Sequence, residues 1–231
     1  MQTPVESTPA PRLLTLKDIK ANPKVKNLID GANEVMRAMG YTEHGHRHAG
    51  VVSSITRYIM ENVSAPARSI ELGQIAAYLH DIGNVINRVG HPVSGAGLAY
   101  NILNEMGMDT IEIAPILGAI GNHEELAGQP ISLMSAALIV ADKSDVHYSR
   151  VQNPIIETFD IHDRVNYAVQ KSRVNIDPQK QVVELTLEID TSFASVMEYF
   201  EIFLSRMVMC RKACDIFGFK FTLSVNGTSM E

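Results

Sequence analysis

The 231-residue chain has no tryptophan, only two cysteines and few aromatic residues, 6% in all. Two cysteines cannot form a disulfide framework. Cys210 and Cys214 lie four residues apart in an expected helix, which is a poor geometry for a disulfide, so we expect two reduced thiols in the core. With 45% apolar residues, a chain of this length can instead be held together by an ordinary hydrophobic core.

Long apolar runs are also missing from the sequence. The longest uncharged apolar stretch, residues 131–141, is about half of the roughly 20 residues that a membrane span needs. The first residues, MQTPVESTPAPR, contain neither the basic region nor the apolar region of a signal peptide. We therefore expect no membrane segment and a cytoplasmic location.

An excess of positive charge is likewise absent. The chain has 20 Lys and Arg residues against 26 Asp and Glu residues, a formal net charge of −6. This mildly acidic balance argues against broad binding to nucleic acid or to an anionic membrane, although a local basic pocket is compatible with it.

The apolar pattern predicts a mainly helical protein. Residues 1–12 contain three prolines and little apolar mass, so we expect a disordered tail. Residues 13–152 are expected to form a helical domain, with helices predicted at Lys24–Met39, His46–Val63, Ser69–Leu79, Ser94–Met106, Ile111–Asn122 and Ile131–Tyr148.

The pattern changes after residue 152. Val183, Leu185, Leu187 and Ile189 alternate with polar residues, which predicts a strand with one wet face. A preceding strand near 172–176, a helix over 192–217 and a final strand over 219–225 complete a β-β-α-β appendage, residues 153–231. Its exposed strand edges suggest a homodimer.

The most informative motif is AAYLHDIGN, residues 76–84, which places His80 and Asp81 at the end of an apolar helix. Burying both costs several kcal/mol unless a partner satisfies them, and a divalent cation does so. A second His-Asp pair, His162–Asp163, lies in a polar stretch, and we interpret it as a solvated helix start.

Other histidines and one aspartate accompany the first pair. Most of them lie near the ends of predicted helices, so several helices could direct ligands into one cavity: His44, His46, His48, His91, His123 and Asp142. One such histidine alone is more typical of a hydrogen-bonded structural residue. Six ordered His and Asp positions, counting His80 and Asp81 but not His46 and His48, are harder to explain in that way.

The order H…HD…D within a helical body resembles the HD-domain superfamily of metal-dependent phosphohydrolases, over roughly residues 25–150. The resemblance implies an HD-domain helical bundle that binds one or two divalent ions, among Mn, Fe, Mg, Ni and Zn. It implies a first metal on His44, His80, Asp81 and Asp142, and a second on Asp81, His91 and His123. In this interpretation His48 packs in the core, although its i, i+4 spacing lets it assist or replace His44.

The chain also departs from that family. Asn84 stands where HDIG is usually followed by Lys, and Asn122 precedes His123 where some two-metal members have a His pair. The GYP signature of cyclic-di-GMP phosphodiesterases is absent, since Gln129 follows Gly128. The missing GYP signature argues against that particular substrate.

The expected function is cleavage of a nucleotide or other small phosphate monoester or diester by a metal-activated water. Asp81 would bridge the ions, and Lys143 and Glu124 are further candidates for catalysis, Glu124 as a proton shuttle. Arg47, Arg88 and Lys143 are candidates for binding the substrate phosphate, because each is near a predicted ligand in sequence.

Two other functions fit the same residues. Two-iron oxygenases of this superfamily use a similar His and Asp set to activate O₂, and oxygen uptake would distinguish them from a hydrolase. A nucleotide-sensing module without catalysis is the third possibility, in which the appendage contacts a partner. Turnover across a broad substrate panel would exclude the sensor.

Overall fold

The computed structural model describes residues 13–230. The predicted disordered tail, residues 1–12, lies outside the described residues. The described part is mainly helical with one small sheet, so the predicted mainly α class is confirmed. None of the helices within 13–230 is both long and apolar enough to cross a membrane.

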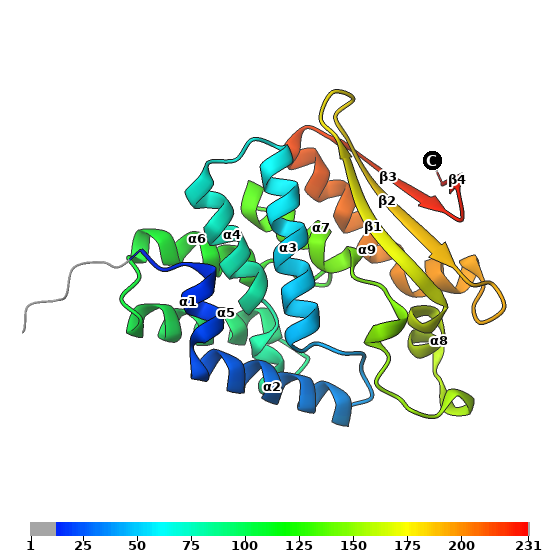
Figure 1. The fold of residues 1–231 in the computed structure, drawn as a ribbon, viewed down its shortest axis with the longest axis horizontal. Helices are drawn as coiled ribbons and strands as arrows, with labels where there is room; N and C mark the ends of the chain where they lie inside the picture. Colours follow the sequence, from blue (N-terminus) through cyan, green and yellow to red (C-terminus); the bar gives the residue numbers. More distant parts are fainter. Residues whose placement is uncertain (1–12, 231) are drawn as a thin grey trace, which may run out of the picture.

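The first part of the chain is a bundle of helices (Figure 1). They are α1 (Leu16–Ala21), α2 (Pro23–Ala38), α3 (His46–Asn62), α4 (Ala67–Leu79), α5 (His91–Glu105), α6 (Thr110–Gly121) and α7 (Leu133–Ser144). In Figure 1, α3 crosses the middle of the molecule, with α4 on one side and the sheet on the other. Helix α7 packs against α3, α4 and α6, which makes it the centre of the bundle.

The 3₁₀ turn η1 (Ile82–Val85) lies inside the bundle, between α4 and α5. The 3₁₀ turns η2 (Tyr148–Arg150) and η3 (Ile156–Thr158) and helix α8 (Ile161–Ala168) connect α7 to the sheet. Three predicted helix bounds were wrong by three residues or more, one of them the start of the last long helix, which lies at Val196 rather than at residue 192. Helix α5 begins earlier than Ser94, because Gly90 takes the left-handed conformation (φ 77°) and Pro92 suits a first helical turn. Helix α7 ends at Ser144 rather than Tyr148.

The predicted β-β-α-β order is present in the C-terminal part. Strands β1 (Val169–Asp177) and β2 (Val182–Ile189) are antiparallel, α9 (Val196–Phe217) crosses over, and β3 (Lys220–Val225) lies parallel to β2. A two-residue strand, β4 (Thr228–Ser229), adds a fourth member that was not predicted. Ser195 and Glu198 form a capping box at the start of α9.

One hydrophobic core extends through both parts. The inward face of β2 is buried, as its alternation predicts, and α9 packs on α7. Leu138 of α7, Leu185 of β2 and Cys210 of α9 belong to the same buried cluster. Cys210 and Cys214 are buried free thiols, as expected. The division at residue 152 and the homodimer stay predictions.

Candidate metal centre

A close backbone contact brings the HDIG segment against the start of α5. His80 and Asp81 follow the last residue of α4, and η1 comes next. At Gly83 an added Cβ would lie 2.0 Å from the backbone oxygen of His91, so no side chain fits there. This contact places Nε2 of His91 3.3 Å from Oδ1 of Asp81.

Four buried histidines surround Asp81 and are oriented in the same way. In each of them Nδ1 contacts an oxygen of its surroundings: 2.6 Å to Asp145 Oδ2 for His48, 2.7 Å to the Ala77 carbonyl for His80, 2.9 Å to the Arg88 carbonyl for His91, and 2.6 Å to the Ile120 carbonyl for His123. Carbonyl and carboxylate oxygens accept, so each Nδ1 donates. The Nε2 atoms of all four are left facing the centre.

The two carboxylate oxygens of Asp81 face two different groups of imidazoles. Oδ2 lies 3.2 Å from Nε2 of His80 and 3.4 Å from Nε2 of His48. Oδ1 lies 3.3 Å from Nε2 of His91 and 3.8 Å from Nε2 of His123. Asn84 donates a 2.9 Å hydrogen bond to Oδ1, which holds the carboxylate in this orientation.

Asp142, in the last turn of α7, completes the first of these groups. Its Oδ1 lies 3.3 Å from Nε2 of His48 and 3.6 Å from Nε2 of His80. Its Oδ2 lies 2.9 Å from Nζ of Lys143. The candidate ligand atoms of His48, His80 and Asp142 all lie within 4.8 Å of one another, and so do those of His80, Asp81 and His123.

The electrostatics of the cluster favour a bound cation. Burial alone would raise the pKa of Asp81, but His80 and the other imidazoles outweigh burial and hold that pKa well below its usual range. Asp142 is likewise held ionised, against its burial, chiefly by Lys143. Burial lowers the pKa of His80, yet the two carboxylates prevail and raise it to about 10. The two buried carboxylates therefore stabilise a positive charge at Nε2 of His80. Either a proton or a metal ion can supply that charge.

The residues present fit a divalent metal. Oδ2 of Asp81 is buried and has no hydrogen-bond partner among residues 13–230. Nε2 atoms also approach one another closely, 3.0 Å between His91 and His123 and 3.3 Å between His48 and His80. Such imidazole nitrogens and carboxylate oxygens are common metal ligands, and an ion would satisfy all of them together. The hydrogen bonds at Nδ1 are the usual support of metal-binding histidines.

His48 was expected to pack in the core or to assist His44, and the structure places it, fully buried, in the cluster. Its Nε2 lies in the cluster, within 3.4 Å of Asp81 and 3.3 Å of Asp142. His44, chosen from the motif, precedes α3, donates from Nδ1 to the Thr42 carbonyl at 2.6 Å, and lines the adjacent cavity. The ring centroids of His44 and His48 are 5.5 Å apart. The ligand role of His44 stays a prediction.

A helical signal could have identified His48. The buried positions of α3 are His48, Ala49, Val52, Ser53, Thr56, Ile59 and Met60. These follow the i, i+4 spacing of one helix face, on which His48 precedes Val52. His46 is outside this face and contacts Tyr78 and Asp30 instead.

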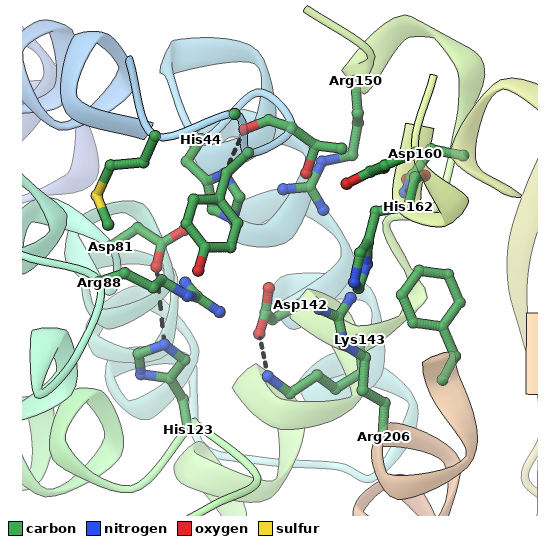
Figure 2. A pocket seen from close by; sticks show the side chains of 16 residues that line it. His44, Asp81, Arg88, His123, Asp142, Lys143, Arg150, Asp160, His162 and Arg206 are labelled. Carbon is green, nitrogen blue, oxygen red and sulfur yellow. Dashed lines mark hydrogen bonds and ion pairs between the residues drawn. The ribbon is translucent and has the colours of Figure 1, made fainter. Parts of the chain in front are cut away.

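A cavity of about 310 Å³ opens beside the cluster. Asp81, His123 and Asp142 form its floor, and four cationic side chains line it: Arg88, Lys143, Arg150 and Arg206. Figure 2 shows these side chains around the space in front of Asp142. Lys143 is buried and pairs with Asp142 and, at 2.6 Å, with Glu125. The cavity is thus suited to an anionic ligand.

Two other predicted site residues lie elsewhere. Arg47 is outside the cavity lining and pairs with Glu43 and Asp145, at 3.0 and 2.8 Å. Glu124 is also outside the lining, 3.8 Å from Arg88. The neighbouring Glu125, rather than Glu124, contacts Lys143. The roles of Arg47 in substrate binding and of Glu124 in catalysis stay predictions.

The second His-Asp pair lies at a helix start, as predicted, but only its histidine is solvated. Asp163 is 6% exposed and accepts a 3.2 Å hydrogen bond from Asn153. Asp160 is the N-cap of α8, which explains why a helix begins there. His162 is exposed, but its side chain lines the cavity wall opposite Asp81 (Figure 2).

Comparisons with known proteins give similarities to a curated protein and to a solved structure. No family model matches the chain. Over 202 residues, 77% of each protein, the chain is 24% identical to a protein of Methanocaldococcus jannaschii described as uncharacterized protein MJ1020. A solved structure from an uncultured Thermotogales bacterium, described as a predicted HD superfamily hydrolase, is 25% identical with a TM-score of 0.43. That similarity covers 58% of this chain and 75% of the solved one.

Proposed function

We propose that the protein is an HD-type metal-dependent phosphohydrolase with two divalent ions, acting on a nucleotide or another small phosphate monoester or diester. One observation carries this proposal: each carboxylate oxygen of Asp81 faces its own pair of imidazole Nε2 atoms. A carboxylate in that position is suited to bridge two ions. His48, His80 and Asp142 would complete the first site, and His91 and His123 the second.

Residues next to the candidate ligands would hold them in position in such a centre. Two divalent ions lower the pKa of bound water and neutralise charge on the phosphoryl oxygens. Asp145 accepts the hydrogen bond from Nδ1 of His48 and so fixes the ring with Nε2 toward the ions. Asn84 fixes the Asp81 carboxylate in the same manner. These contacts hold the ligands in place before metal binds.

Positive side chains in the cavity would bind the substrate phosphate. Asp142 and Glu125 raise the pKa of Lys143 despite its burial, so the ammonium group stays charged. Arg88 lines the opposite side, 3.5 Å from Nε2 of His91. A phosphate between Lys143 and Arg88 would receive charge-assisted hydrogen bonds from both.

The decisive test combines metal analysis with a substrate screen. Protein purified without added metal should contain close to two equivalents of a divalent transition metal, and metal-loaded protein should release phosphate or alcohol from members of a phosphatase and phosphodiesterase panel. Asp81→Asn should lose metal and activity together while its circular dichroism stays helical. A fully metallated and active Asp81→Asn variant would contradict the proposal.

The same screen separates the hydrolase from an oxygenase, because four imidazoles and two carboxylates also suit a two-iron centre. Phosphate release that persists under argon supports hydrolysis. Oxygen uptake without phosphate release would replace the proposal with the oxygenase. Metal binding without any turnover would favour a sensor.

A further inference from the structure

The C-terminal part of the chain supplies one wall of the cavity. His162 and Asn166 come from α8, and Phe203 and Arg206 come from α9. In Figure 2, the side chains of Arg206 and His162 lie across the cavity from Asp81 and Arg88. Substrate in the cavity would therefore contact both the helical bundle and α9. The position of Arg206 indicates which part of a substrate this residue would bind.

The guanidinium of Arg206 is held in one orientation. Its Nε donates to Oε1 of Glu125 at 3.2 Å, and its carbon lies 4.5 Å from the centroid of the Phe203 ring. Phe203 is 1% exposed and packs against Tyr199, so the surface below the guanidinium is rigid. No residue of the described chain, 13–230, accepts a hydrogen bond from the two Nη atoms. These atoms are free to bind an anion bidentately.

Arg206 stands farther from the candidate metal ligands than Lys143 does. A chain of ion pairs leads outward, from Asp142 to Lys143 at 2.9 Å and from Lys143 to Glu125 at 2.6 Å. Arg206 comes last, bound to the far oxygen of Glu125. A phosphate that reacts at the metal ligands would meet Lys143 first. An anionic group meeting Arg206 would be a different, more distant one.

We propose that Arg206 is a specificity-determining residue that binds a second anionic group of the substrate, a phosphate or a carboxylate distant from the phosphate that is cleaved. The preferred substrates are then small phosphate esters with two separated anionic groups. This inference rests on the proposed function for the cleaved phosphate, but the binding of the distant anion is independent of turnover.

Two matched ligands test the idea, 3-phosphoglycerate and glycerol 3-phosphate, which differ in having a carboxylate or a hydroxymethyl group at the far end. Their dissociation constants are measured by calorimetry on the full chain loaded with Mn²⁺, with KM used for any ester that is hydrolysed. Wild type should bind 3-phosphoglycerate at least about tenfold more tightly, the expected effect of a charged hydrogen-bonded pair.

Three variants test whether Arg206 causes the preference for 3-phosphoglycerate over glycerol 3-phosphate. Arg206→Gln should abolish the preference, so that its dissociation constants for 3-phosphoglycerate and glycerol 3-phosphate lie within about threefold of each other. Arg206→Lys keeps the charge and the pairing with Glu125 but not the bidentate geometry. This variant should therefore show only part of the preference for 3-phosphoglycerate. Arg211→Gln, at an exposed position of the same helix outside the cavity, should keep it in full.

The inference is overturned if wild type shows no preference, or if Arg206→Gln retains it at wild-type melting temperature. Full recovery by Arg206→Lys would also overturn it, since it would reduce the role of Arg206 to pairing with Glu125. A wild type that prefers 3-phosphoglycerate through Arg206 yet hydrolyses no ester would contradict the proposed function alone.

Discussion

The chain contains the same dipeptide twice, and the two copies have different surroundings. His80 and Asp81 are buried among three other histidines, whose Nε2 atoms all face the Asp81 carboxylate. In His162–Asp163 the aspartate is buried against Asn153, while the histidine is exposed at the cavity wall. The two side chains of the second pair therefore have different surroundings, one exposed and one buried.

The difference teaches that a His-Asp pair becomes a candidate metal site only through what other segments bring to it. For His80 and Asp81 these are the start of α5 with His91, the second residue after α6 with His123, and α3 with His48. Gly83 permits the approach of α5. At Asp163 the neighbouring Asn153 supplies an amide donor, which satisfies a carboxylate oxygen without an ion.

The strongest way to break the comparison is Asp81→Asn. The amide is neutral and cannot bridge two cations, so we expect loss of bound metal and a fall in kcat/KM of at least about a thousandfold, equivalent to several kcal/mol of transition-state stabilisation. Metal content by mass spectrometry and phosphate release check this. Retained helical circular dichroism serves as the control, because a misfolded variant would lose metal for a trivial reason.

Much of the candidate site could be predicted from local patterns. HDIG at the end of an apolar helix indicated His80 and Asp81, and the structure places His91, His123 and Asp142 around them. The choice between His44 and His48 depended on where α3 begins. A motif alone does not define that point, whereas the buried face of the helix places His48 inward.

Other contacts form only in the tertiary fold, and local sequence patterns do not predict them. Arg206 lies far along the chain from Glu125, and only the packing of α9 on α7 brings the two together. The alternation of β2 predicted its strand, and the length of α9 its helix, but neither indicates that α9 lines a cavity. Arg47 was chosen by proximity in sequence and instead pairs with Asp145.

A smaller effect is expected from Asp145→Asn. This variant tests the hydrogen bond that orients His48 at the first His-Asp pair. The amide no longer draws the Nδ1 proton of His48 with a full charge, so metal affinity should fall about 10- to 100-fold. A competition assay with a chelator measures the change. Arg47→Gln removes another partner of Asp145 and should change affinity less than about threefold; an equal loss would show that Asp145 acts through the whole ion-pair network.

A third prediction concerns pH. Without metal, the carboxylates of Asp81 and Asp142 outweigh burial and raise the pKa of His80 to about 10, so at neutral pH an ion must displace a proton. Protons compete with the metal, and affinity should therefore rise with pH, by up to about tenfold per unit for each proton displaced. Calorimetry in buffers of different ionisation enthalpy counts the released protons. Affinity that is the same at acidic and neutral pH, with no proton release, would contradict this.

The smallest effect is expected at the second pair. Asp163→Ala removes the acceptor of a 3.2 Å hydrogen bond from Asn153 and should lower the free energy of unfolding by about 1 kcal/mol. Metal content and kcat/KM should stay within about twofold of wild type, because the Asp163 carboxylate contacts none of the candidate ligands in the described chain. Thermal melts and the phosphate-release assay measure both quantities. Loss of metal in this variant, comparable to that of Asp81→Asn, would mean that the ion binds at the other His-Asp pair.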